Sequence, residues 1–245
     1  MQRYFAKKKD DDDFILYDND IHHIKNVMRF KNGEKIEVVY DNDVYLCEII
    51  DLNPLSLRKI EKLQEDSEMN IELIAAISLV NEQKMDLILQ KLTELGVSKI
   101  IPIKTERSII KLDALKETKK INRWQTICKE ASEQSKRKII PAVSPITTID
   151  ELSKISKEMK LICTLNDNCQ PLSNYLQKNT KQVLFAIGPE GGFAPNEEKK
   201  LIENGFLPVS LGKRVMRVET AAIYVASIIN YIYEGWYYEF YCRIL

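Results

Sequence analysis

From residue 70 onward, short apolar runs alternate with amphipathic segments, and this alternation limits the possible folds more than any other feature. Runs such as Ile71–Val80 and Gln182–Ile187 are predominantly apolar, as expected for strands that are buried on both faces of a sheet. Between them, Glu82–Leu95 carries its apolar residues on a single helical stripe. The pattern predicts an α/β domain with a parallel sheet over residues 70–245.

The same periodicities predict the remaining elements of this domain. Further strands are expected at Val97–Ile103, Lys160–Leu165 and Pro208–Leu211. Further helices are expected at Ile121–Ser135, Pro195–Asn204 and Glu219–Glu234, and another between the capping box Thr148–Glu151 and Met159.

Residues 1–69 follow a different pattern, with short alternating segments separated by turn residues. Strands are expected at Phe14–Tyr17, Lys35–Tyr40, Val44–Ile50 and Leu57–Leu63, with a helical segment at His22–Phe30. The charged stretch Lys7–Asp13 is interpreted as a solvated loop. We therefore expect residues 1–69 to form a small β-barrel.

Composition limits the class of protein. The five cysteines lack CxxC spacing and the two histidines are adjacent, so neither a disulfide framework nor a metal site is expected. The first residues lack the apolar core of a signal peptide, and no apolar run is long enough for a transmembrane helix. These features predict a cytoplasmic protein with no membrane partner.

Charge is balanced over the whole chain, with 36 Lys and Arg against 36 Asp and Glu. Between Lys99 and Lys138, however, we count twelve basic residues against five acidic residues, a local excess of seven. A basic face of this kind suits contact with nucleic-acid phosphates. An ordinary solvated, lysine-rich helix explains the same count equally well.

Three loops follow the carboxyl ends of predicted strands, where open α/β sheets bind ligands. They are Leu165–Asn168, Gly188–Phe193 and Leu211–Ala221, and four of the chain's eight glycines lie in the last two. Neither phosphate-binding glycine pattern is present, and Glu190 would repel a phosphate. The loops suit a ligand that is read by backbone groups, such as an adenine edge, although a plain turn at Gly188–Gly192 is the alternative.

The second and third loops resemble the cofactor-binding region of the SPOUT superfamily, and more closely that of the 16S ribosomal RNA (uracil-N3) methyltransferase family. The resemblance extends in order along nearly the whole chain. The matching segments are Arg3–Phe5, His23–Arg29, Lys84–Asp86, Gln90–Val97, Glu106–Ser108, Glu130–Ser135, Ile187–Phe193 and Ser210–Ala221. Ala194 departs from the family's usual serine helix cap, and Ser135 from its commoner cysteine or small residue.

The resemblance implies an N-terminal PUA-like β-barrel that binds RNA, residues 1–69, and a C-terminal trefoil-knot methyltransferase domain, residues 70–245. It implies a homodimer that uses S-adenosyl-L-methionine to methylate N3 of a uridine in 16S rRNA, in the decoding region of the 30S subunit. The implied cofactor-binding residues are Leu165, Asn166, Ile187, Gly188, Pro189, Gly191, Gly192, Leu211, Gly212, Val215, Met216, Thr220 and Ala221.

Methylation at uracil N3 requires loss of the N3 proton and stabilisation of the charge that spreads to the carbonyl oxygens. Arg217 is the expected charge stabiliser or substrate-positioning group, and Glu219 and Glu190 are the candidate acids. Glu219 lies in the first turn of a predicted helix, where its carboxylate could equally order the loop. Thr220 either caps this helix or binds the cofactor carboxylate.

Contacts to RNA are expected from basic residues that position the phosphate backbone rather than read bases. These are Arg3, Arg29, Arg107, Lys136, Arg137, Lys138 and Arg214. His23 is expected to satisfy a hydrogen bond at the barrel edge rather than to act in catalysis. The aromatic segment Trp236–Tyr241 is expected to pack or face a second subunit, with base stacking as the alternative.

Three other functions stay open on sequence alone. A SPOUT ribose 2′-O-methyltransferase acting on rRNA or tRNA would share the C-terminal motifs, although the N-terminal barrel and the Arg217–Thr220 segment favour base methylation. A noncatalytic ribosome-binding protein of the same fold is opposed by the intact loops. A nucleotide-binding regulatory protein is opposed by the missing phosphate loop.

Overall fold

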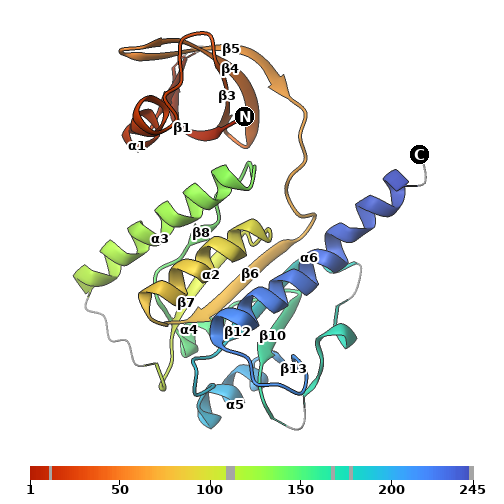
Figure 1. Ribbon diagram of the computed structural model, residues 1–245. Coiled ribbons are helices and arrows are strands. Elements are labelled where there is room, and N and C mark those ends of the chain that lie inside the picture. The colour runs from red at the N-terminus through yellow and green to blue at the C-terminus, as the bar shows by residue number, and fades with distance from the viewer. Residues whose placement is uncertain (11–12, 109–113, 167–168, 177–178, 243–245) are drawn as a thin grey trace. The chain divides into compact units, whose positions relative to one another are not determined.

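The computed structural model describes residues 1–10, 13–108, 114–166, 169–176 and 179–242, with the backbone alone at 114–115 and 235–242 (Figure 1). The chain divides into two compact units. Unit 1 comprises residues 1–68 and 129–140, and unit 2 comprises residues 69–128 and 141–245. The sequence predicts a single boundary after residue 69, with 129–140 in the second domain.

Unit 1 is a five-stranded sheet in the order β2-β1-β3-β4-β5. Its strands are β1 (Arg3–Asp10), β2 (Asp13–Leu16), β3 (Lys35–Tyr40), β4 (Asp43–Leu52) and β5 (Leu55–Leu63). β1 and β3 are parallel, and the other neighbours are antiparallel. The edge strands β2 and β5 also contact each other, which curls the sheet into the expected barrel around buried Tyr4, Ile36 and Ile49 (Figure 1).

Two features of unit 1 differ from the sequence-based prediction. The segment Lys7–Asp10 continues β1 and pairs with β2, with Lys9 opposite Phe14, so this part is a strand and not a loop. Its side chains are charged and mostly exposed, so the segment lacks the apolar alternation that predicts a strand. Residues 11–12 lie outside the described residues. The helical segment begins earlier than predicted, as α1 (Asp18–His22), and continues as a π-helical turn, His23–Val27.

Unit 2 is built on a parallel sheet in the order β11-β13-β10-β12-β6-β7-β8, and β9 also pairs with β7. Every strand pair of this sheet is parallel in the described residues. The strands are β6 (Glu72–Ser78), β7 (Lys99–Lys104), β8 (Ala142–Val143), β9 (Thr147–Thr148), β10 (Met159–Cys163), β11 (Gln170–Pro171), β12 (Gln182–Ile187) and β13 (Leu207–Ser210).

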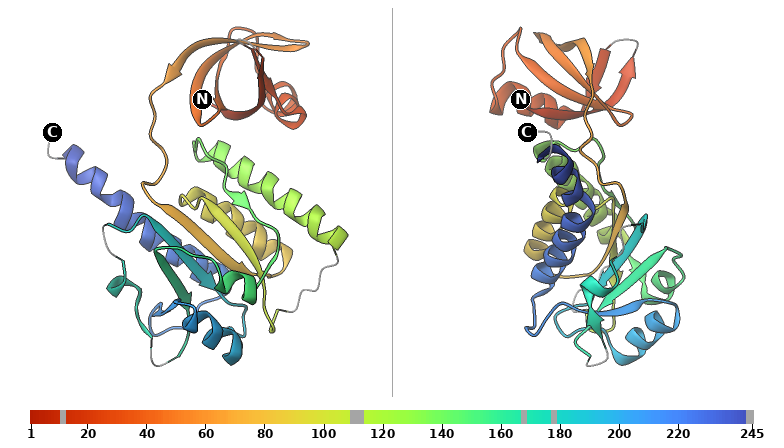
Figure 2. Two further views of the ribbon diagram at one scale, coloured as in Figure 1. Left: turned by 180° about the vertical axis from the view of Figure 1, so that it is seen from behind. Right: turned by 90° about the vertical axis from the view of Figure 1, so that its right-hand side faces the viewer.

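The helices are α2 (Glu82–Glu94), α3 (Ala114–Gln134), α4 (Ile149–Ser153), α5 (Pro195–Glu203) and α6 (Val218–Cys242), with a 3₁₀ turn at Leu172–Asn174. α2 and α6 pack on one face of the unit 2 sheet, and α4 and α5 pack on the other (Figure 2). Compared with the prediction, α3 begins seven residues earlier, α4 is shorter and α6 is longer. None of the helices in the described part of the chain is long and apolar enough to span a membrane.

Local chemistry fixes where the helices begin. Asn81 caps α2 by accepting a hydrogen bond from the backbone nitrogen of Lys84. Thr148 and Glu151 form the predicted capping box of α4. Ala194 at the start of α5 has no side-chain acceptor, but Glu197 Oε2 accepts from the Ala194 backbone nitrogen at 2.9 Å. The helix therefore keeps one half of a capping box.

The strand order decides where the predicted loops lie. β13, β10, β12 and β6 are consecutive neighbours in the parallel sheet. The loops after β10, β12 and β13 and the start of α2 after β6 therefore leave the same edge of the sheet, at the carboxyl ends of the strands. Ligands of open α/β sheets bind at this edge, so we expect the functional site there.

Candidate functional site

A cavity opens at this edge of unit 2 between the three predicted loops. Ten of the residues that line it were expected to bind a cofactor: Leu165, Ile187, Gly188, Pro189, Gly192, Leu211, Gly212, Val215, Met216 and Ala221. Cys163, Thr164, Glu190, Arg214 and Val218 also line it. Asn166, Gly191 and Thr220 lie outside its wall, and residues 167–168 of the first loop lie outside the described residues.

Glycine is favoured at three positions in the cavity wall. A Cβ atom at Gly188 would lie 3.0 Å from the backbone nitrogen of Phe193, a tight contact that another residue could make only if Phe193 shifted. Gly192 and Gly212 have φ values of +70° and +113°, which other L-residues rarely adopt. A Cβ at either position would meet no atom within 4 Å, so both glycines leave open space beside the cavity. Backbone groups and apolar side chains such as Ile187 and Met216 thus form a cradle that fits the adenosyl part of the expected cofactor.

Arg107 supports the glycine-rich loop from outside. Its Nη1 donates hydrogen bonds to the carbonyl oxygens of Gly191 and Phe193, at 2.6 and 3.3 Å. The guanidinium therefore ties the segment after β7 to the loop after β12. The sequence predicts an RNA phosphate as the partner of Arg107, whereas its partners in the structure are backbone carbonyls.

Two glutamates of α5 hold the neighbouring loops. Glu198 Oε1 accepts from Thr164 Oγ1 at 2.6 Å and from Asn166 Nδ2 at 2.5 Å, so the Asn166 side chain binds α5 and does not line the cavity. Glu197 is buried, and its Oε1 accepts from the backbone nitrogen of Glu106 at 2.7 Å. Sequence reasoning assigned no role to either glutamate, because a helical acid is usually a solvated one.

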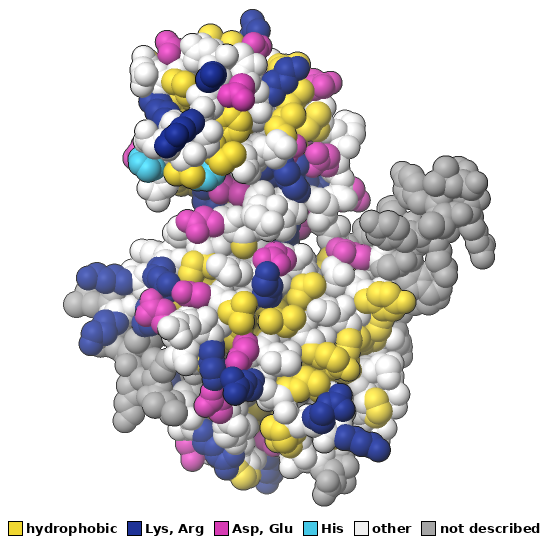
Figure 3. Space-filling model, in the orientation of Figure 1, with side chains coloured by type: hydrophobic (Ala, Val, Ile, Leu, Met, Phe, Trp, Pro, Cys, Tyr) yellow, Lys and Arg dark blue, Asp and Glu magenta, His cyan; other side chains and the backbone are white. Residues whose placement is uncertain are grey.

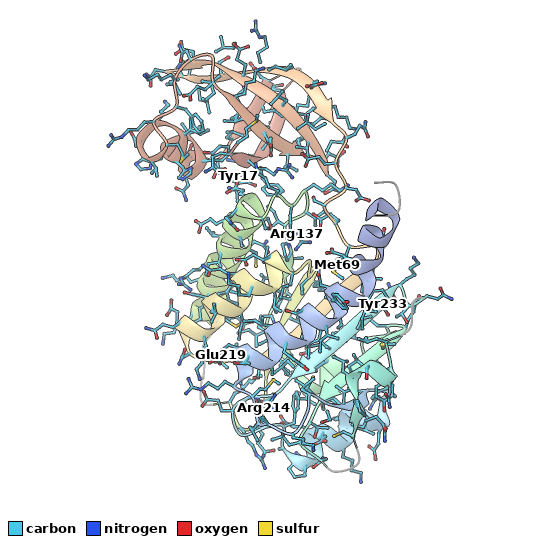
Figure 4. All side chains as sticks on the ribbon, turned by 45° about the vertical axis from the view of Figure 1, so that its right-hand side comes forward. Tyr17, Met69, Arg137, Arg214, Glu219 and Tyr233 are labelled. Carbon is cyan, nitrogen blue, oxygen red and sulfur yellow. The ribbon has the colours of Figure 1, made fainter. Side chains whose placement is uncertain are left out.

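A charged groove adjoins the cavity and shares Glu190, Val215 and Met216 with it. Lys84, from the first turn of α2, and Arg217, from the loop before α6, complete its lining. The Lys84 ammonium donates a hydrogen bond to Glu190 Oε1 and lies 3.9 Å from Glu219 Oε2. Figure 4 shows Glu219 at the start of α6 and Arg214 in the loop that precedes it.

Of the three predicted catalytic residues, Glu190 and Arg217 line the groove and Glu219 lies beside it, 3.9 Å from Lys84. The structure adds Lys84 to this group. Sequence reasoning placed Lys84 in a helix motif but gave it no chemistry. Lys84 is the third residue of a capped helix that follows a central strand. That position, at the carboxyl end of the strand, is the feature of the sequence that indicates a role in the site. The hydrogen bond from Lys84, together with its charge, holds the pKa of the Glu190 carboxyl below its usual value, and Arg217 adds a smaller contribution.

Cys163 ends β10 and lines the cavity. Burial raises the pKa of its thiol to about 12, so the sulfur stays protonated at neutral pH. A thiol in this form is a weak nucleophile and suits the wall of a site that holds a reactive alkyl donor.

Two of the residues expected to contact RNA are buried in ion pairs of unit 1, which corrects that prediction. The Arg3 guanidinium is fully buried and donates to Glu37 Oε2 at 2.9 Å, to Glu65 and to the Lys136 carbonyl. Arg137 is 3% exposed and pairs with Glu68 Oε2 at 2.6 Å. Neither guanidinium presents a surface to a phosphate.

The basic excess counted along residues 99–138 is largely compensated by acids from other segments. Within unit 2, Arg123 pairs with Asp86 at 2.5 Å. Within unit 1, Lys129 pairs with Asp20 at 2.7 Å and Lys136 with Glu37 at 2.8 Å. A count along the chain misses these partners, so it does not establish a basic face.

The remaining expected RNA contacts differ in exposure. Arg29 and Arg214 are exposed. Lys136 and Lys138 are partly exposed, and Lys138 Nζ lies 3.7 Å from Asp66. His23 Nδ1 lies 2.9 Å from the Tyr4 hydroxyl, the satisfied hydrogen bond that the sequence suggested. The described residues contain no cluster of His, Cys, Asp and Glu suited to a metal ion.

Comparison with known proteins places this geometry in a family. The profile of an RNA methyltransferase domain matches residues 67–230, and that of an RNA methyltransferase PUA domain matches residues 16–61. Ribosomal RNA small subunit methyltransferase E of Bacillus subtilis is 32% identical, over 94% of this chain and 96% of its own length. The chain belongs to the ribosomal RNA small subunit methyltransferase E family.

Solved relatives support the same assignment. A methyltransferase from Legionella pneumophila in complex with S-adenosylmethionine has a TM-score of 0.87 and 29% identity, covering 94% of this chain and 96% of that chain. The methyltransferase E of Neisseria gonorrhoeae bound to S-adenosylmethionine has a TM-score of 0.86 and 30% identity, covering 95% and 98%. The family recognised from sequence motifs and the expected fold class, an α/β methyltransferase domain preceded by a PUA domain, are therefore confirmed.

Proposed function

We propose that this chain transfers the methyl group of S-adenosylmethionine to N3 of a uridine in the decoding region of 16S rRNA. The observation that carries the proposal is the charged groove, which shares Glu190, Val215 and Met216 with the cavity. A base placed in such a groove lies next to a methyl donor in the cavity. Relatives named as small-subunit rRNA methyltransferases support the choice of RNA.

In this proposal the cavity holds the methyl donor through the residues that line it, with Arg214 at its edge. The donor supplies a methyl group on a positively charged sulfur, so the protein has to orient two reactants and remove a proton. Arg217 stabilises the charge that develops on the uracil carbonyl oxygens. Glu190 and Glu219 are the two candidate proton acceptors. Asn166 and Gly191 act on the donor only through the loops that carry them, and Thr220 acts only through the first turn of α6.

Supporting contacts to the RNA are proposed for the exposed residues Arg29 and Arg214 and for Lys136 and Lys138, which are partly exposed. We propose that the substrate is the 30S subunit in the cytoplasm, where ribosomes are assembled.

We also propose that the protein is a homodimer. Large apolar side chains are exposed on α2 and α6, among them Leu87, Tyr224 and Tyr231, which is 77% exposed. Figure 3 shows hydrophobic side chains gathered on the face of unit 2 that carries α6. Val215 and Leu165 at the cavity are also 76% and 70% exposed, so a second subunit would complete the wall.

The test is to incubate the protein and labelled S-adenosylmethionine with 30S subunits, naked 16S rRNA and bulk tRNA from a strain that lacks the gene. Nucleoside analysis should find 3-methyluridine from one of the 16S substrates. Labelled 2′-O-methylated nucleosides, or no product from any RNA, would overturn the proposal.

A further inference from the structure

The two candidate acids differ sharply in environment: Glu190 lines the groove, whereas Glu219 lies beside it, 3.9 Å from Lys84. The Glu190 side chain is 61% exposed, and the Lys84 ammonium already donates a hydrogen bond to it. The Glu219 side chain is 14% exposed. Its Oε2 is one of four buried side-chain oxygen or nitrogen atoms in the described residues that have no hydrogen-bond partner. Lys84 Nζ, at 3.9 Å, is near enough to stabilise the carboxylate but too far to donate to it.

We infer that Glu219 accepts the N3 proton. Lys84 is a positioning residue, because it donates a hydrogen bond to Glu190 and none to Glu219. This inference rests on the proposed function and deepens it.

The unsatisfied oxygen of Glu219 supports its role as the proton acceptor. A buried carboxylate oxygen without a donor costs free energy that a correctly placed N–H recovers. Uracil N3–H is a donor of this kind, flanked by two carbonyl oxygens that suit the nearby cation Arg217. Glu190 has no buried oxygen that lacks a donor, because its carboxylate is exposed to water and accepts a hydrogen bond from Lys84. The bond from Lys84 also lowers the pKa of Glu190, which makes it a weaker base than a carboxylate without that partner.

The start of α6 places Glu219 in the first turn of the helix, next to the groove. The backbone nitrogen of Ala221 donates to the carbonyl oxygen of Arg217 at 2.8 Å, so α6 begins immediately after the loop of the groove. A carboxylate in this first turn is stabilised by the helix dipole in its ionised form, the form that a proton acceptor needs.

In the transfer step, the N3–H bond breaks with its electron pair left on N3, and the proton bonds to the Glu219 carboxylate. N3 forms its bond to the methyl carbon while the carbon–sulfur bond breaks, and that electron pair stays on sulfur. The protonated Glu219 later gives its proton to water. Lys84 holds Glu190 in a hydrogen bond and away from the proton.

The experiment measures single-turnover methylation of unmodified 30S subunits between pH 6 and pH 9. Variants are Glu219→Gln, Glu190→Gln, Lys84→Met and Lys84→Arg, with Lys91→Met on the same helix as the matched control. Lys91 pairs with Glu94 at 2.8 Å at the far end of α2. Calorimetry with S-adenosylhomocysteine and filter binding of 30S subunits report on binding independently of turnover.

We expect Glu219→Gln to lower the rate at pH 7 by about 10²- to 10⁴-fold, the usual loss for a missing general base. The remaining rate should rise about tenfold per pH unit, because solvent hydroxide then removes the proton. Glu190→Gln should lower the rate much less than Glu219→Gln, and its remaining rate should not rise about tenfold per pH unit. Lys84→Met should lower the rate with unchanged S-adenosylhomocysteine and 30S affinity, and Lys84→Arg should restore part of it.

A merely structural Glu219 gives a different result: weaker S-adenosylhomocysteine binding or a lower melting temperature, and no pH-dependent recovery. That result, or a large loss in Glu190→Gln with Glu219→Gln near wild type, would overturn the inference. If wild-type enzyme forms no 3-methyluridine, the proposed function itself fails. The two failures are therefore distinguishable in one set of reactions.

Discussion

Arg107 donates a hydrogen bond of 2.6 Å from Nη1 to the carbonyl oxygen of Gly191, joining the segment after β7 to the loop that walls the cavity. Because Arg107 lies outside the cavity wall, its effect on a ligand is exerted through that loop. The contact also distinguishes two interpretations of Arg107, as a support for the loop or as an RNA contact.

Arg107→Ala should therefore weaken S-adenosylhomocysteine binding by about three- to tenfold, in line with loss of a charge-assisted hydrogen bond. Affinity for 30S subunits should change by less than about twofold. The matched variant is Arg29→Ala, an exposed arginine of unit 1 that should leave S-adenosylhomocysteine binding unchanged. Calorimetry and filter binding measure both. A loss confined to 30S affinity in Arg107→Ala would show that the arginine serves RNA.

Gly212→Ala should impair the cofactor cavity through backbone strain alone. Gly212 has φ +113° and Gly33 in unit 1 has φ +90°, and a Cβ atom at either position would meet no other atom within 4 Å. Both alanine variants should lose about 1–2 kcal/mol of unfolding free energy. Only Gly212→Ala should weaken S-adenosylhomocysteine binding, because only Gly212 lines the cavity. Equal affinities in the two variants would contradict this.

Arg3→Met should destabilise unit 1 strongly. The variant leaves Glu37 and Glu65 without the guanidinium that both share, and the Lys136 carbonyl without its donor. Breaking a buried pair of this kind costs about 3–5 kcal/mol. Arg58→Met, which removes an exposed pair with Glu48 in the same barrel, should cost less than about 1 kcal/mol. Urea unfolding gives both values, and similar losses would argue against a structural role for Arg3.

Glu133 should make stability depend on pH. Burial raises its pKa to about 7, with Lys129 opposing and Asp20 adding to the shift. An acid whose folded pKa is raised favours the folded state below its unfolded value of 4.5 and loses that contribution as pH rises through about 7. Glu133→Gln should therefore remove part of the stability that wild type loses between pH 5 and pH 7.5. Parallel melting temperatures for the two proteins over this range would contradict the shift.

The sequence alone determined the sheet and most of the cavity. Strands buried in a parallel sheet are apolar on both faces, so β6, β10 and β12 are recognisable as predominantly apolar runs. Glycine at positions 188, 192 and 212 was visible for a similar reason, because close approach and positive φ admit little else. These requirements are local, so each one restricts the residue type at its own position and can be recognised in the sequence.

Pairing between distant segments was decided only by the tertiary structure. Arg3 and Arg137 were interpreted as RNA contacts because their acidic partners, Glu37 and Glu68, lie far away in sequence. The charged strand at Lys7–Asp10 was missed because its partner β2, and not its own pattern, makes it a strand. The meeting of Lys84, Glu190 and Glu219 depends on strand order, which brings the starts of α2 and α6 and the loop after β12 to one edge of the sheet. Electrostatic partners are set by distance in space, and a linear sequence does not record that distance.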